Sequence, residues 1–304
     1  MPPLLPLWLR RADPDAVALR LPDRLIRYRE SPSLACKKLQ IIEGTASEIA
    51  IAFFTGSTVF PLSPRLNPPH RARFIALAEE SPKNTALIIT TSGSENAPKA
   101  IRLTWRSIAA GARMVNRAVH LQAGDVWLAA LPLCHIGGAM IPYRCWRAGA
   151  TALIHHGFQP DHVLRDLNIH RVTHLSLVPV MLDRLLEADP TPPPPSLRVV
   201  LVGGANLDPS LHQRALAAGW PVVPVYGMTE TCATATFFRQ PLPGVRCRVT
   251  SSHTLDIATP ARMAGYLGEP DIDEWVITQD VGEITASGEV HVASRTAASW
   301  KTNS

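Results

Sequence analysis

Small hydroxyl residues and glycine gather in one segment, residues 90–100, which reads TTSGSENAPKA. The segment lies between a predicted strand at 85–90 and a predicted helix at 105–119. Such a loop can offer backbone N–H groups and hydroxyls to phosphate oxygens, and a terminal lysine adds a cation. A plain surface turn is the competing interpretation of the loop taken alone. The candidate phosphate-binding residues are Thr91, Ser92, Gly93, Ser94 and Lys99.

A second constellation follows the predicted strand at 222–226. It comprises an aromatic ring that can stack on a base, a hydroxyl for phosphate and a carboxylate for Mg²⁺. Its residues are Tyr226, Gly227, Met228, Thr229 and Glu230. Open α/β sheets gather ligands at the carboxyl ends of their strands, so this segment and the phosphate loop are expected to meet.

Gly203, Gly204 and Ala205 end a third predicted strand, at 198–203. Backbone without side-chain bulk lets a flat ring approach closely. The three residues are therefore candidates for one wall of a base-binding site.

Alternating strand and helix patterns position these residues. Apolar β-branched runs predict further strands at 126–131 and 173–178, and amphipathic spacing predicts helices at 179–188 and 208–218. The pattern is typical of an α/β fold with layered, mostly parallel sheets flanked by helices.

After Pro241 the pattern changes to short alternating strands, at 274–278, 282–286 and 289–293. We therefore predict an α/β region at 1–240 and a small antiparallel β subdomain at 241–304.

Composition excludes several classes of protein. The 304 residues carry a formal net charge of +5 without a dense basic run interleaved with aromatics, so nucleic-acid binding is not expected. No uninterrupted apolar run reaches about eighteen residues, and the N-terminus lacks the order of a secretion signal. A cytoplasmic protein without a membrane span is expected. The five cysteines form no C-x-x-C pair, so a zinc site is not expected either.

In order and spacing, these segments resemble the adenylate-forming superfamily of acyl-CoA synthetases, luciferases and peptide-synthetase adenylation domains, from about residue 12 to 295. The resemblance implies that residues 131–138 place His135 at the acyl pocket, and that residues 278–283 place Asp280 on the ribose hydroxyls. It also implies that Arg295 belongs to a hinge at 292–295. Within the superfamily, the pattern is most similar to the o-succinylbenzoate–CoA ligases of menaquinone biosynthesis.

The resemblance implies a reaction in two steps. An aromatic or dicarboxylic acid attacks the α-phosphorus of ATP in the presence of Mg²⁺, pyrophosphate leaves, and CoA as co-substrate then displaces AMP. Lys99, His135, Thr229 and Glu230 take the catalytic roles, with Glu230 as the metal ligand. Arg65 and Arg102 are either partners for a second substrate carboxylate or ordinary surface arginines.

The sequence departs from the family pattern in two ways. Glu95 and Asn96 replace a threonine and a glycine of the phosphate loop, and a carboxylate beside triphosphate is repulsive. The sequence given also ends nine residues after the hinge, so the C-terminal domain with the adenylation lysine is expected to be absent or supplied as a separate partner. Two alternatives stay open: a degenerate nucleotide-binding or partner-binding module, and an adenylation domain that loads a carrier protein.

Overall fold

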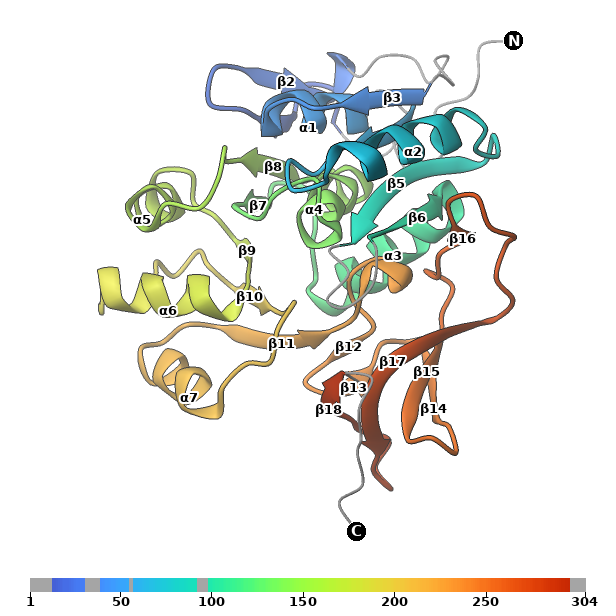
Figure 1. The fold of residues 1–304 in the computed structure, drawn as a ribbon. Coiled ribbons are helices and arrows are strands. Elements are labelled where there is room, and N and C mark those ends of the chain that lie inside the picture. Colours follow the sequence, from blue (N-terminus) through green and yellow to red (C-terminus); the bar gives the residue numbers. More distant parts are fainter. Residues whose placement is uncertain (1–12, 31–38, 55–56, 92–97, 296–304) are drawn as a thin grey trace.

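The computed structural model describes residues 13–30, 39–54, 57–91 and 98–295. Within these residues, sheets and helices alternate in layers (Figure 1). The layering confirms the predicted fold class of mostly parallel sheets flanked by helices.

The larger sheet has nine strands in the order β13-β12-β11-β10-β9-β7-β8-β1-β2. Its central strands, from β11 to β1, run parallel, and the strands at its two ends pair antiparallel. The strands are β1 (Val17–Arg20), β2 (Leu25–Arg27), β7 (Val126–Ala129), β8 (Thr151–Ile154), β9 (His174–Leu177), β10 (Val199–Val202), β11 (Val222–Tyr226), β12 (Thr236–Phe237) and β13 (Gln240–Pro241).

The second sheet has five strands in the order β16-β6-β5-β4-β3. Here β3, β4 and β5 run parallel, whereas β6 is antiparallel to both of its neighbours. The strands are β3 (Leu39–Ile42), β4 (Thr58–Pro61), β5 (Thr85–Thr91), β6 (Lys99–Thr104) and β16 (Gly265–Tyr266).

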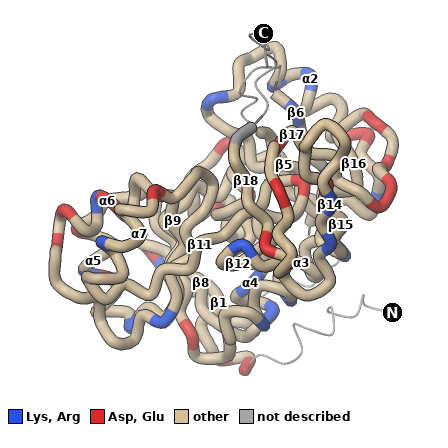
Figure 2. The backbone as a smooth tube through the Cα atoms, turned by 90° about the horizontal axis from the view of Figure 1, so that it is seen from below, with Lys and Arg blue, Asp and Glu red and all other residues tan. Residues whose placement is uncertain are grey.

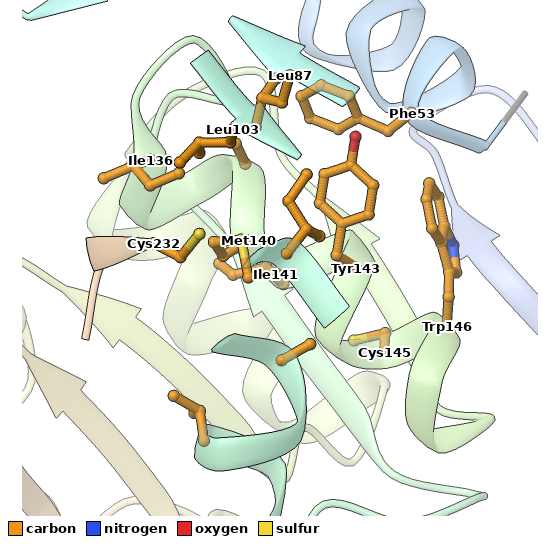
Figure 3. Close-up of a cluster of buried hydrophobic side chains, with 14 of the residues drawn as sticks. Phe53, Leu87, Leu103, Ile136, Met140, Ile141, Tyr143, Cys145, Trp146 and Cys232 are labelled. Carbon is orange, nitrogen blue, oxygen red and sulfur yellow. The ribbon is translucent and has the colours of Figure 1, made fainter. Parts of the chain in front are cut away.

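Three helices, α1 (Ala46–Phe54), α3 (Trp105–Ala118) and α4 (Ile136–Ala148), share one core with residues of both sheets. In this core the ring of Tyr143 packs 5.2 Å from those of Phe53 and Trp146 (Figure 3). The outer face of the nine-stranded sheet carries α5 (Pro160–Ile169), α6 (Pro179–Ala188) and α7 (Pro209–Ala217). The other face of the five-stranded sheet carries α2 (Pro68–Glu79).

Local signals explain where several elements begin and end. Thr104 accepts the Ser107 N–H and caps α3, and Asp208 accepts the N–H groups of Ser210 and Leu211 at the start of α7. Gly219 follows α7 with φ of +81°. The predicted strands and helices between residues 85 and 226 are confirmed, with ends that differ by one or two residues.

Helix α4 is an element that the sequence patterns did not reveal. Nearly every residue from Ile136 to Trp146 is buried, so the helix shows no polar face, and Pro142 lies inside it. A helix that is buried all round has no amphipathic period to detect.

A small antiparallel sheet of order β14-β15-β17-β18 confirms the change of pattern after Pro241. Its strands are β14 (Arg246–Val249), β15 (Thr254–Ala258), β17 (Trp275–Ile284) and β18 (Val290–Arg295). The prediction of two separate strands at 274–278 and 282–286 was wrong, because residues 275–284 form the single strand β17. Its register shifts between Val281 and Gly282, and this irregularity interrupts the alternation that marks one strand. The boundary between residues 240 and 241 stays a prediction.

Charges of both signs are distributed over the molecule, including the outer helices α5 to α7 (Figure 2). Among the helices of the described ranges, none combines the length and the apolar character needed to span a bilayer.

Candidate functional site

The ends of β10 and β11 lie side by side. These strands pair in parallel with Val202 opposite Pro224, so Gly203, which follows β10, and Tyr226, which ends β11, lie at the same carboxyl edge of the sheet. A Cβ added at Gly203 would lie 2.6 Å from Val225 Cγ2, which explains the glycine by close approach. Gly204 has φ of +78° and, like Ala205, is exposed.

A tight turn follows Tyr226 and carries the 3-10 helix η3 (Thr229–Thr231). A Cβ at Gly227 would lie 2.3 Å from the Ala233 carbonyl oxygen, so this position needs glycine. The buried Thr231 hydroxyl accepts the Met228 N–H at 3.1 Å and lies 3.1 Å from the Met228 carbonyl oxygen.

Cys232 and Ala233 continue the turn with φ of +52° and +82°. Left-handed backbone at such residues persists only where the surroundings impose it. The turn therefore carries Thr229 and Glu230, both partly exposed, on a backbone whose conformation is fixed by its surroundings.

One short segment joins this turn to the phosphate-loop hairpin. The Met263 N–H donates to the Glu230 carbonyl at 2.7 Å, and the next residue, Ala264, donates to the Arg102 carbonyl in β6 at 2.9 Å. Residues 265–266 then pair with β6 as β16. Residues 263–266 therefore contact both the turn at residues 226–230 and the hairpin that carries the predicted phosphate loop.

Thr91 and Lys99 face each other as the last pair of the β5–β6 hairpin. The Thr91 hydroxyl donates to the Lys99 carbonyl at 3.4 Å, and Lys99 Nζ lies 4.6 Å from the centroid of the Tyr266 ring. Ser92, Gly93 and Ser94, together with Glu95 and Asn96, lie outside the described residues.

Asp280 comes from the small sheet and meets Tyr226. The Tyr226 hydroxyl donates to Asp280 Oδ2 at 2.8 Å, although the two residues are 54 positions apart in the chain. Asp280 is 5% exposed. Arg295 is its register partner on β18, so the structure brings the backbones of these two predicted site residues together as well.

His135 occupies the position before α4 and is half-buried. Burial, and secondarily the positive charge of Arg65, lowers the pKa of His135, so the imidazole is neutral at neutral pH. Gly138 allows the first turn of α4 to approach the preceding loop, because a Cβ there would lie 2.4 Å from the Pro132 carbonyl oxygen.

Arg144 is a residue of this region that sequence reasoning missed. It is 2% exposed, its guanidinium carbon lies 5.3 Å from the Trp127 ring centroid, and its Nη2 donates to Thr234 at 3.1 Å. Helix α4 therefore braces the end of the turn that carries Thr229 and Glu230. Arg144 lies between apolar and aromatic residues in the segment 136–146, and this placement was the signal available in the sequence.

Arg102 is not an ordinary surface arginine, which was one of its two predicted roles. It is 3% exposed and donates to Asp271 Oδ1 at 2.8 Å and to the carbonyls of Glu269 and Tyr266. Arg102 therefore fixes the segment after β16. Arg65 is exposed.

No cluster of three or more His, Cys, Asp or Glu side chains suited to a metal occurs within the described ranges. Two cavities, of about 540 and 430 Å³, lie elsewhere, beside β3 and α1 and around Gly124 and Arg198. We place the site by its converging strand ends, because ligands of open α/β sheets bind there.

Comparison with known proteins gives a family, a similar curated protein and similar solved structures. Residues 31–294 match the AMP-binding enzyme family. The chain is 36% identical over 151 residues to the 2-succinylbenzoate–CoA ligase of Staphylococcus epidermidis, an alignment that covers 50% of this chain and 32% of that protein.

Two solved structures of o-succinylbenzoate CoA synthetase from Bacillus subtilis share the fold, each with a TM-score of 0.83 over 96% of this chain. One, in complex with the acyl-adenylate intermediate OSB-AMP, is 22% identical in sequence, and the superposition covers 100% of that chain. The other, in complex with ATP and magnesium, is 21% identical in sequence, and the superposition covers 80% of that chain.

Proposed function

The chain belongs to the AMP-binding enzyme family, and from this premise we propose that it binds ATP and activates a carboxylic acid as an acyl adenylate. The single observation that carries the proposal is the meeting of separate segments at one place. Tyr226 contacts Asp280, and residues 263–266 connect the backbone of Glu230 to the strand that begins with Lys99.

Each part of the nucleotide has candidate partners in this arrangement. The adenine stacks on the ring of Tyr226 and lies against the backbone of residues 203–205. Asp280 accepts hydrogen bonds from the ribose hydroxyls. Thr229, Lys99 and the loop from Thr91 to Ser94 hold the phosphates. These donors reduce the repulsion between the phosphates and the approaching carboxylate.

The residues present fit a magnesium ion that shares its ligands with the nucleotide. Mg²⁺ in nucleotide sites is usually bound by one or two carboxylates together with substrate phosphates. Glu230 is partly exposed beside Thr229 and can supply such a carboxylate. The ion would neutralise charge on the phosphates during transfer.

The reaction forms one bond and breaks one at the α-phosphorus. A carboxylate oxygen of the acid attacks the α-phosphorus. The bond between the α-phosphorus and the oxygen that bridges to the β-phosphate breaks, and pyrophosphate leaves with the electron pair of that bond. His135, at the start of α4, lines the acyl side as a neutral ring. We propose an aromatic dicarboxylate of the 2-succinylbenzoate type as the acid, supported by the names of the similar proteins.

We propose CoA as the acceptor and the cytoplasm as the location, in line with the same similarity. The sequence match spans only about a third of the Staphylococcus epidermidis ligase. ATP binding is therefore the direct test of this chain.

Titration calorimetry with ATP and Mg²⁺, followed by thermal melting with ATP and o-succinylbenzoate, tests the proposal. At one hundred times its Kd, a ligand of the native state adds about 2.7 kcal/mol to stability, enough to raise Tm by several degrees. The Lys99→Met variant should show a smaller shift. No heat and no shift with ATP and a panel of acids would overturn the proposal.

Glu95 and Asn96 favour a second candidate, a module that keeps the fold and has lost the chemistry. A carboxylate close to triphosphate costs on the order of 1 kcal/mol or more when it is partly desolvated. If this candidate is right, the parent binds ATP weakly and the double variant Glu95→Thr, Asn96→Gly binds it much more tightly. Equal affinities would exclude the candidate.

A further inference from the structure

The hydrogen bond between Tyr226 and Asp280 joins two different sheets. Tyr226 ends β11 of the nine-stranded sheet, and Asp280 lies in β17 of the small antiparallel sheet. The donor and acceptor are 2.8 Å apart, and the acceptor carboxylate is almost fully buried. A hydrogen bond to an ionised acceptor is shorter and roughly twice as strong as a neutral one.

The backbone around Asp280 is irregular in a way that sets the direction of its side chain. The register of β17 shifts against β15 between Thr254 and Asp256, and against β18 between Val281 and Gly282. The Asp280 N–H donates to the Thr278 hydroxyl of the same strand at 3.0 Å. Bulges of this kind re-aim a side chain and are common beside active sites.

Gly282 shows that this irregularity is built into the sequence. A Cβ at this position would lie 2.3 Å from the His291 carbonyl oxygen and 2.7 Å from Leu255 Cδ1. Only glycine lets β18 approach so closely directly after the bulge. The backbone thus directs Asp280 toward the end of β11, where the Tyr226 hydroxyl meets it.

We infer that the Tyr226 hydroxyl is a positioning group that fixes the Asp280 carboxylate for the ribose hydroxyls of the nucleotide, an inference that rests on the proposed function. An ionised carboxylate has about four lone-pair positions, so it can accept hydrogen bonds from the tyrosine hydroxyl and from the ribose hydroxyls together. Fixing its plane before the nucleotide arrives removes an ordering cost at binding. One side chain then couples recognition of the base, through its ring, with recognition of the sugar, through its hydroxyl.

The Tyr226→Phe variant separates the two roles, because it keeps the ring and removes the hydroxyl. The Kd values of ATP and 2′,3′-dideoxy-ATP, both with Mg²⁺, are measured by calorimetry for each protein. We expect the wild type to prefer ATP and Tyr226→Phe to lower that preference roughly three- to tenfold, the range for one hydrogen bond. Affinity for the dideoxy nucleotide should hardly change.

Asp280→Asn and the double variant test whether the tyrosine acts through the aspartate. We expect Asp280→Asn to remove most of the ribose preference, and the added Tyr226→Phe change to have no further effect. Tyr143→Phe is the matched control, since the buried Tyr143 hydroxyl has no hydrogen-bond partner in the described structure. It should leave the preference unchanged.

Several results would overturn the inference. The preference for ATP could survive in Tyr226→Phe, or both nucleotides could weaken equally, which would indicate a role for the ring or for folding alone. Additive losses in the double variant would also contradict it. If Asp280→Asn does not fold, the ratio in Tyr226→Phe decides by itself. A wild type that binds neither nucleotide would overturn the proposed function together with this inference.

Discussion

Lys99 Nζ lies 4.6 Å from the centroid of the Tyr266 ring. The two residues come from adjacent strands of the five-stranded sheet, β6 and β16, and Lys99 closes the hairpin opposite Thr91. A cation over an aromatic face gains about 0.5–1 kcal/mol at an exposed site. Tyr266 therefore gives the exposed ammonium a preferred position beside the candidate phosphate loop.

We predict that Lys99→Met weakens binding of ATP with Mg²⁺ about tenfold, equivalent to about 1.4 kcal/mol, because a phosphate loses its cation. Tyr266→Leu should weaken binding two- to threefold, whereas Tyr266→Phe, which keeps an aromatic face, should bind almost as the wild type does. Calorimetry at two salt concentrations checks this prediction. Identical affinities for Tyr266→Leu and Tyr266→Phe would show that the ring does not position the lysine.

The sequence predicted best those features that depend on neighbouring residues. Thr104 and Asp208 cap helices through contacts within three residues, so their positions could be seen in the sequence. Helix α4 could not be predicted in this way, because its burial on all sides depends on both sheets.

The same reasoning applies to the candidate site. Tyr226 and Asp280 were each predicted as site residues, but no local pattern reveals that their side chains meet. The burial of Arg102 was also hidden, because it depends on the return of residues 264–271 to β6. Pairings over long sequence distances are outcomes of the whole fold.

Gly227→Ala tests the tight turn after Tyr226. The new Cβ would lie 2.3 Å from the Ala233 carbonyl oxygen, so the backbone must shift. We predict a loss of about 1–3 kcal/mol in the free energy of unfolding, measured in urea, and weaker ATP binding. Gly137→Ala, inside helix α4, is the control, because among the described residues a Cβ there has Leu131 Cδ1 as its nearest neighbour, at an ordinary contact distance of 3.4 Å. If the two variants had equal stability, the turn would not require glycine.

Thr231→Val tests the hydroxyl that closes the same turn. The side chain is fully buried, and its removal leaves the Met228 N–H without this acceptor. A buried group that loses its partner costs about 1–3 kcal/mol, so the free energy of unfolding should fall by that amount. Thr231→Ser keeps the hydroxyl and should recover most of the loss. Wild-type stability in Thr231→Val would contradict the assigned contact.

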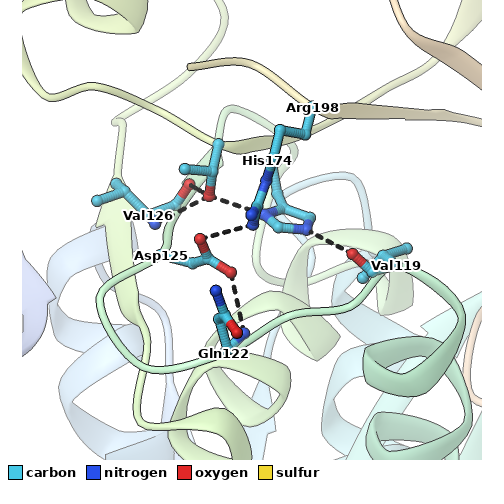
Figure 4. Close-up of polar contacts among 7 residues, drawn as sticks. Val119, Gln122, Asp125, Val126, His174 and Arg198 are labelled. Atoms are coloured by element: carbon cyan, nitrogen blue, oxygen red, sulfur yellow. Dashed lines mark hydrogen bonds and ion pairs between the residues drawn. The ribbon is translucent and has the colours of Figure 1, made fainter.

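His174 should make stability depend on pH between about 7 and 5. The ring is fully buried and stacks 5.2 Å from Trp127. Its Nδ1 lies 2.8 Å from the Thr173 hydroxyl, and its Nε2 lies 3.2 Å from the Val119 carbonyl oxygen (Figure 4). Burial lowers the pKa of His174, and the hydrogen bond to Val119 and the charge of Asp125 oppose this effect only in part.

Because the pKa is lower in the folded protein than the unfolded value of about 6.5, protonation favours the unfolded chain. The contribution of His174 to stability is therefore complete above about pH 6.5 and is lost as the pH falls below it. We predict that wild type loses free energy of unfolding more steeply between pH 7 and 5 than His174→Gln, by about 1.4 kcal/mol for each unit of pKa shift. His135, His155 and His170 also have lowered pKa values, but they titrate in both proteins and cancel in the difference. Urea unfolding at several pH values measures the two slopes, and parallel curves would show that His174 does not supply this dependence.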